Sequence, residues 1–311
     1  MKNRLKGSFV LLITALIWGT TFIMQKKASD LVGAFTFNFV RSIIATILLT
    51  IIAFFTRNTI KTEEVDEKGN VVSKKKIYVF SILAGIGMAG GATLQQIGIK
   101  TSEASTAAFL TSLYMIFVPI LGLMFGKKVK AKIWICVVSA VIGAYILAKS
   151  GDNFFSFDLS FGSILIVISG MFWALQINAV SKIANNINPF KLCAIELLVT
   201  TIVSFVGMIV SESVIIENVY KAMPFILYAA ILSGTISFAF QNIGQKYCES
   251  NIATLIMSLE SIFALLSGII FLKETLEINE VIGSIIIFVS VIIAQINFNF
   301  KKKIDTLDET C

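Results

Sequence analysis

The sequence predicts an all-α, polytopic membrane protein with ten transmembrane helices arranged as two inverted five-helix repeats. Of the 311 residues, 56% are apolar and only 14% are charged, which is about half the charged share of a typical soluble domain. The apolar residues form long continuous runs, and the first half of the chain resembles the second. These observations exclude a soluble enzyme and a disordered chain, in agreement with the mean hydropathy of +0.87.

Ten segments are long and apolar enough to cross a bilayer, which takes about 20 residues for a ~30 Å hydrocarbon core. They are 8–24, 34–55, 77–97, 105–125, 133–148, 161–181, 189–210, 224–242, 252–271 and 281–297, the fifth being the shortest. Strands of a membrane β-barrel would instead alternate apolar and polar residues over ~10 positions. The first run follows a basic segment but lacks a small-residue cleavage site, so we expect it to be retained as a span.

Basic residues predict the orientation of the spans, because Lys and Arg accumulate in cytoplasmic loops. With a cytoplasmic N-terminus, the inner segments contain 18 Lys and Arg and the outer segments contain 6. The long loop 56–76 is rich in charge and is expected to be a solvated hairpin or linker on the inner side, not a domain. We therefore predict a plasma-membrane protein with both termini in the cytoplasm.

An internal repeat relates the two halves of the chain. Residues 7–18, GSFVLLITALIW, align with 162–173, GSILIVISGMFW, and residues 95–103, QQIGIKTSE, align with 241–249, QNIGQKYCE. The second alignment continues with Ser112-Leu113 over Ser258-Leu259. Because each copy contains five spans, the second copy must cross the membrane in the opposite direction. Inverted repeats are typical of secondary transporters, whose substrate sites lie between the repeats near the membrane midplane.

The sequence also resembles the EamA-type permeases of the drug/metabolite transporter superfamily. Four motifs are similar to those of the family: IWGTTF at 17–22, FNFVR at 37–41, AAFLTSLYMIFVP at 107–119, and SLESIFA at 258–264 followed by FLKE at 271–274. The family usually has a proline where this chain has Ser261. The resemblance implies one EamA repeat at 8–148, a second at 161–297 and a cytoplasmic tail at 298–311. It also implies transport of small metabolites, often amino acids or drugs and usually outward.

Three charged residues lie inside predicted spans, where a charge is costly and normally faces a partner or water. They are Arg41, Glu196 and Glu260, each about seven residues from a membrane face. The functional interpretation is that these residues bind substrate or protons in a central cavity. The structural alternatives are that Arg41 reaches toward the outer head groups and that Glu196 is a partner of a helix end or an amide. Apolar surroundings favour the protonated form of a carboxyl group, so Glu260 is the candidate proton carrier. Glu274, at an outer helix end, is predicted to be a helix cap or gate contact.

Aromatic and amide residues complete the predicted substrate pathway. Trp18 and Trp173 occupy equivalent repeat positions, and Tyr114 is the repeat equivalent of Glu260. All three could line the cavity or serve only in helix packing. The amides Gln96, Gln176 and Gln241 could bind substrate, although hydrogen bonds between helices are their commoner use.

Other classes of function are disfavoured by what the sequence lacks. The chain has no histidine and no aspartate inside a span, which argues against most intramembrane enzymes. The four cysteines are far apart, so no metal site is predicted, and no cofactor or nucleic-acid partner is expected. The prediction is a transporter, not an enzyme, whose partners are a small-molecule substrate and the lipid bilayer. The sequence leaves open a channel or scaffold, coupling to protons or uniport, and a monomer or homodimer.

Overall fold

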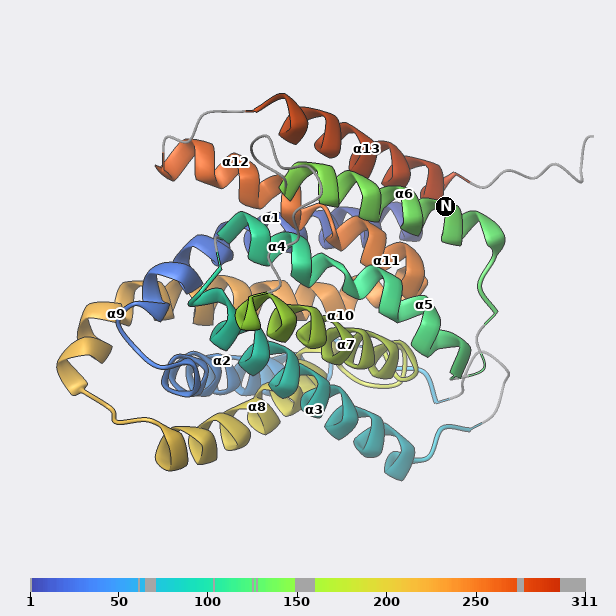
Figure 1. Cartoon of the computed structure of the whole chain (residues 1–311). Helices are drawn as coiled ribbons and strands as arrows, with labels where there is room; N and C mark the ends of the chain where they lie inside the picture. Colours follow the sequence, from blue (N-terminus) through green and yellow to red (C-terminus); the bar gives the residue numbers. More distant parts are fainter. Residues whose placement is uncertain are drawn as a thin grey trace, which may run out of the picture.

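The computed structural model describes residues 2–60, 62–64, 71–102, 104–124, 126, 128–148, 160–272 and 277–296, and the regular elements in these ranges are helices (Figure 1). The first half contains α1 (Lys2–Ser29), α2 (Ala34–Thr56), α3 (Lys74–Ile99), α4 (Ala104–Ser112), α5 (Tyr114–Met124) and α6 (Ala131–Ala148). The second half contains α7 (Phe161–Ser181), α8 (Pro189–Ser211), α9 (Ile216–Tyr228), the π-helix η1 (Ala229–Ser237), α10 (Phe238–Tyr247), α11 (Ser250–Met257), α12 (Glu260–Leu272) and α13 (Ile278–Gln295).

These helices confirm the predicted fold class. Among the described residues, nine helical stretches are long and apolar enough to cross a membrane, and Ala131–Leu147 is a shorter apolar helix at the predicted fifth span. Three predicted spans are not single α-helices. The fourth is divided into α4 and α5, the ninth into α11 and α12, and the eighth contains the π-helix η1 between α9 and α10.

The two halves interlock, because equivalent helices from each half pack side by side. Helix α2 contacts α8, and α6 contacts α13; Figure 1 shows α6 and α13 together along one edge of the molecule. A Cβ on Gly143 of α6 would lie 2.9 Å from the Gly283 oxygen, and one on Gly283 of α13 would lie 2.4 Å from the Gly143 oxygen. This reciprocal contact is what an approximate two-fold axis between the repeats requires.

Helix α3 packs closely on α7, and small residues permit this approach. A Cβ on Gly87 would lie 2.7 Å from the backbone nitrogen of Gln176, and one on Gly91 would lie 2.8 Å from the Trp173 ring. Small residues are the usual means by which membrane helices approach closely. This contact brings the α7 residues Trp173 and Gln176 to the centre of the bundle.

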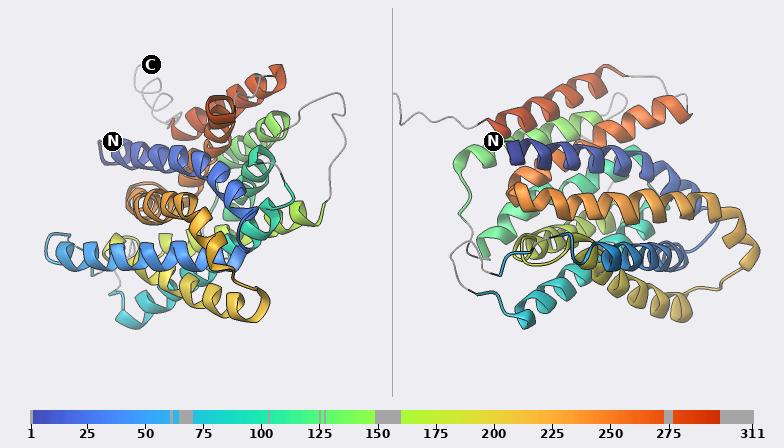
Figure 2. Two further views of the ribbon diagram at one scale, coloured as in Figure 1. Left: turned by 90° about the vertical axis from the view of Figure 1, so that its left-hand side faces the viewer. Right: turned by 180° about the vertical axis from the view of Figure 1, so that it is seen from behind.

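The surface of the bundle is apolar, as a lipid-facing surface must be. Large apolar side chains such as Phe55, Val210 and Ile270 are mostly exposed. The start of α1 and the end of α13 lie at the same end of the bundle in both views of Figure 2. This placement agrees with an even number of crossings.

Candidate functional site

The site is built where two interrupted helices meet at the centre of the bundle. Helix α4 ends at Ser112 and α11 ends just before Ser258, which are aligned positions of the repeat. Each serine hydroxyl donates to a carbonyl three residues earlier, Ser112 to Phe109 at 2.7 Å and Ser258 to Leu255 at 2.8 Å. Such side-chain bonds compete with the helical backbone pattern. The breaks place Tyr114 and Glu260 at the start of new helices, α5 and α12.

A cavity lies beside these breaks, with about 460 Å³ of space between its atoms including its opening. Residues from both halves of the chain line it: Trp18, Thr21, Phe22, Gln25, Arg41, Gln95, Thr111, Tyr114, Trp173, Ile177, Ser233, Phe238, Gln241 and Glu260. Six predicted pathway residues are among them, namely Trp18, Arg41, Tyr114, Trp173, Gln241 and Glu260. Residues far apart in the sequence therefore share one chamber.

Three buried polar atoms of this lining have no hydrogen-bond partner in the described part of the chain, namely Trp18 Nε1, Thr111 Oγ1 and Gln241 Oε1. The Tyr114 hydroxyl and the Glu260 carboxyl group, also in the lining, interact with each other through a side-chain hydrogen bond. Buried polar groups are normally paired, because an unpaired group carries the full cost of its lost hydration. The concentration of the three unpaired atoms around one cavity indicates that a ligand or water completes their hydrogen bonds.

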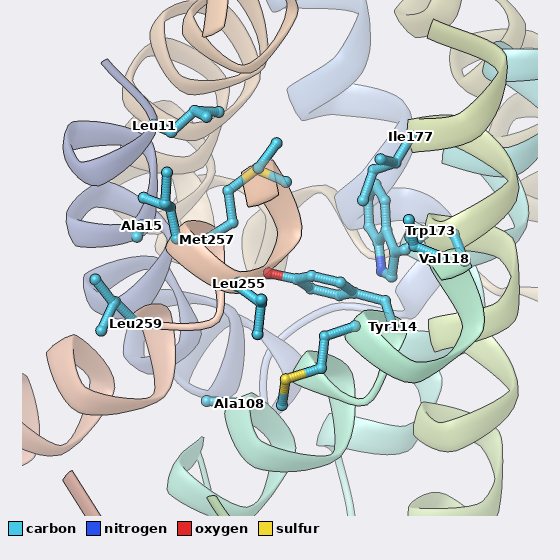
Figure 3. Close-up of a cluster of buried hydrophobic side chains, with 14 of the residues drawn as sticks. Leu11, Ala15, Ala108, Tyr114, Val118, Trp173, Ile177, Leu255, Met257 and Leu259 are labelled. Atoms are coloured by element: carbon cyan, nitrogen blue, oxygen red, sulfur yellow. The ribbon is translucent and has the colours of Figure 1, made fainter. Parts of the chain in front are cut away.

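Aromatic rings form one wall of the cavity. The Trp18 and Trp173 ring centroids are 6.5 Å apart, and Phe238 lies 5.1 Å from Trp18 and is stacked on Trp173 at 5.7 Å. Figure 3 shows the Tyr114 ring reaching from α5 toward α11, with Trp173 and Ile177 on α7 beside it. This wall offers an apolar surface next to the unpaired polar atoms.

Arg41 brings a positive charge to the cavity. Its side chain is 7% exposed, and its guanidinium carbon lies 5.3 Å from the centroid of the Phe37 ring, in a cation–π arrangement. No ion pair to Arg41 is found within the described ranges. A buried and uncompensated cation is costly, so the cavity is suited to a group with negative charge.

Glu196 and Gln176 lie beyond the cavity lining and form a second polar cluster. Glu196 is 0% exposed; its Oε1 accepts from Gln176 Nε2 at 2.7 Å, and its Oε2 accepts from Asn242 Nδ2 at 2.9 Å. Gln241 Nε2 in turn donates to Gln176 Oε1 at 2.9 Å. Gln241 therefore connects this cluster to the cavity.

Gln96 also lies outside the lining, whereas its neighbour Gln95 is part of it. Gln96 Nε2 donates to the backbone oxygen of Gln25 at 3.1 Å. Gln95 accepts from Trp173 Nε1 at 2.9 Å and donates to the Gln25 side chain at 3.3 Å. The repeat contained the signal for Gln95, because Gln95 aligns with Gln241. Glu274 and the tail 298–311 lie outside the described residues.

The apolar helices, the inverted halves and the central cavity define a multi-pass membrane protein with the architecture of a transporter. The model of the EamA-like transporter family matches residues 5–149 and 160–295. The chain belongs to this family.

Similar proteins agree with this assignment. A protein of Archaeoglobus fulgidus named as an uncharacterized transporter is 29% identical over 94% of this chain and 87% of its own length. The uncharacterized transporter YoaV of Bacillus subtilis is 22% identical over 92% of this chain and 96% of its own length. A solved chain described only as a protein crystal structure has a TM-score of 0.73 at 14% identity, covering 93% of this chain and 96% of that chain, and it shows the fold alone.

Proposed function

We propose that this transporter is a secondary transporter that carries amino acids and related small metabolites through the central cavity by alternating access. The observation that carries the proposal is the set of three unpaired buried polar atoms, beside the buried Arg41, around one cavity lined by both repeats. An inverted repeat supplies two related arrangements of the same helices, one open to each side.

The polar groups of the cavity match the two charged ends of an amino acid. Arg41 is a buried cation without an ion pair in the described residues, and it suits a carboxylate. Gln241 Oε1 is an unpaired acceptor within the described residues, and it suits an ammonium group. The Trp18, Trp173 and Phe238 wall suits an apolar side chain. This complementarity favours an amino acid with an apolar side chain over a simple cation or anion.

The location and direction of transport are proposed from the sequence and from the family resemblance. The excess of Lys and Arg in alternate loops favours a plasma-membrane protein with cytoplasmic termini. The resemblance to EamA-type permeases favours export. Protons are the proposed coupling ion, because Glu260 is a cavity carboxyl group that is 2% exposed.

Counterflow in proteoliposomes tests the proposal. Vesicles loaded with an unlabelled compound should transiently accumulate the same labelled compound, using a panel of amino acids, nucleosides and cationic drugs with and without a pH gradient. We expect counterflow for apolar amino acids, and its loss in Arg41→Gln but not in Trp134→Phe, which lies outside the cavity lining. Equilibration without transient accumulation would indicate a channel and contradict the proposal.

A further inference from the structure

We propose that Glu196, which does not line the cavity, sets the hydrogen-bonding group that Gln241 presents to the substrate. Glu196 is then a positioning residue for specificity. The inference deepens the proposed function and rests on it, because it concerns the recognition of the substrate's ammonium group.

The contacts form an ordered relay from Glu196 to the cavity. Gln176 turns its Nε2 toward Glu196 Oε1 at 2.7 Å, and its Oε1 therefore faces Gln241, whose Nε2 donates to it at 2.9 Å. The remaining atom of the Gln241 amide, Oε1, is the one left unpaired at the cavity.

The direction of this relay follows from the contacts of Glu196, because both of its side-chain oxygens accept hydrogen bonds from amide nitrogens and so act as those of a carboxylate. An ionised carboxylate can only accept hydrogen bonds, whereas an amide has one accepting end and one donating end. With Glu196 as the acceptor, Gln176 must donate to it, and Gln241 must donate to Gln176. Each amide is thereby fixed against rotation by 180°, and Gln241 must turn its oxygen to the cavity.

Burial limits the alternative hydrogen-bond partners of the relay residues. Glu196 and Gln176 are both 0% exposed and lie outside the cavity lining, so bulk water does not offer them alternative partners. The second carboxylate oxygen is occupied by Asn242 Nδ2 at 2.9 Å, from the same helix, α10, that carries Gln241. A reversed Gln176 would place two oxygens against each other at Glu196, which is costly in a buried network.

Exchanging the two relay residues gives a sharp test. In E196Q, the new amide at position 196 can donate or accept, so the direction of the relay is no longer specified. In Q176E, two buried carboxylates face each other. In the double variant E196Q/Q176E, the amide at position 196 can donate to the carboxylate at position 176 while accepting from Asn242, and Gln241 still donates to position 176. The same number of bonds can then form again, and Gln241 again presents its oxygen.

The first readout is thermal unfolding of the purified protein and needs no substrate. We expect Q176E to lower the midpoint by about 5 °C or more, and E196Q/Q176E to restore most of the loss. If the double variant is no more stable than Q176E, or fails to fold, the proposed hydrogen-bond relay is wrong.

The second readout is binding of L-leucine and of 4-methylpentanoate, which has the same skeleton without the amino group. Binding is followed by fluorescence of Trp18 and Trp173, with the third tryptophan removed as Trp134→Phe. We expect E196Q to weaken L-leucine binding about 5- to 10-fold and to leave 4-methylpentanoate binding unchanged. The double variant should bind both compounds as the parent protein does.

The outcomes separate the relay from the proposed function. If E196Q weakens the binding of both compounds equally, or does not weaken L-leucine binding, Glu196 has no role in orienting the Gln241 oxygen toward the substrate. If the parent protein binds neither compound, the proposed substrate class fails, and the unfolding comparison alone decides the relay.

Discussion

At the scale of single residues, the sequence identified the charged residues of the cavity more readily than the uncharged polar ones. Arg41 and Glu260 stood out in the sequence because a charge is rare in an apolar span, and the structure places both at the cavity. Gln95 was missed although the repeat aligns it with Gln241. Thr111 was missed because threonine is common in membrane helices and the sequence does not show which face of a helix meets the cavity. Glu196 was found for the same reason as Glu260, yet its carboxylate is satisfied by two amides.

Replacing Glu260 by glutamine tests its role at this scale. Glu260→Gln keeps the size of the side chain but removes titration. We expect accumulation driven by a pH gradient to disappear in proteoliposomes, while counterflow of bound substrate persists, because only the first process needs a proton carrier. Glu217→Gln, on the exposed surface of α9, is the matched control. Gradient-driven accumulation at the parent rate in Glu260→Gln would exclude it as the carrier.

At the scale of elements, the sequence predicted where helices lie but not where they break. The span 161–181 coincides with α7, and 34–55 differs from α2 by one residue. The interruptions at Leu113 and at Ser258–Leu259 carry neither proline nor glycine, and Ser261 stands where the family usually has proline. Ser112 and Ser258 donate to carbonyls three residues earlier at these breaks, but Ser169 makes the same bond inside the unbroken helix α7. A serine in the sequence therefore does not show where a helix is interrupted.

One helix start depends on a residue far away in the chain. Helix α2 begins after Gly33, which has no side chain to cap it, and Glu212 provides the cap from beyond α8. Its carboxylate accepts from the backbone nitrogens of Phe35 and Thr36 at 2.8 Å and from the Thr36 hydroxyl at 2.7 Å. This contact joins the ends of α2 and α8, which are equivalent helices of the two repeats.

Loss of this cap should lower stability. We expect Glu212→Gln to reduce the free energy of unfolding by about 1 kcal/mol, because one accepting oxygen is replaced by a donor that faces another donor. Thermal unfolding in detergent measures it. Glu217→Gln is the control, since Glu217 pairs with Lys221 at 2.8 Å on the exposed surface and such pairs contribute little. Equal midpoints for the two variants would show that the cap is dispensable.

At the scale of the whole molecule, the inverted repeat was predictable because its matching residues include polar ones. The Gln-x-x-Gly-x-Lys-x-x-Glu match at 95–103 and 241–249 is improbable in apolar sequence. The interleaving of the halves was not predictable, because it depends on close contacts such as that between Gly143 and Gly283. The positions of the spans in the sequence do not predict which helices pack against each other.

The orientation of the molecule is a separate prediction. In a variant without native cysteines, Lys68→Cys should be protected from a membrane-impermeant thiol reagent in intact cells, and Asn218→Cys should be labelled. The reason is the threefold excess of Lys and Arg on the predicted cytoplasmic side. Labelling of position 68 from outside would show that the predicted orientation is wrong.

The central claim is that the cavity between the repeats opens alternately to the two sides of the membrane. Thr111 tests it directly, since it lines the cavity and its hydroxyl is unpaired in the described structure. Thr111→Cys, in the variant without native cysteines, is exposed to an impermeant thiol reagent in right-side-out and inside-out vesicles. Ala140→Cys, buried in α6 outside the cavity lining, is the control. We predict labelling of position 111 from both sides, slowed by L-leucine, and no labelling of position 140; labelling of position 111 from one side only, or from neither, would contradict the account.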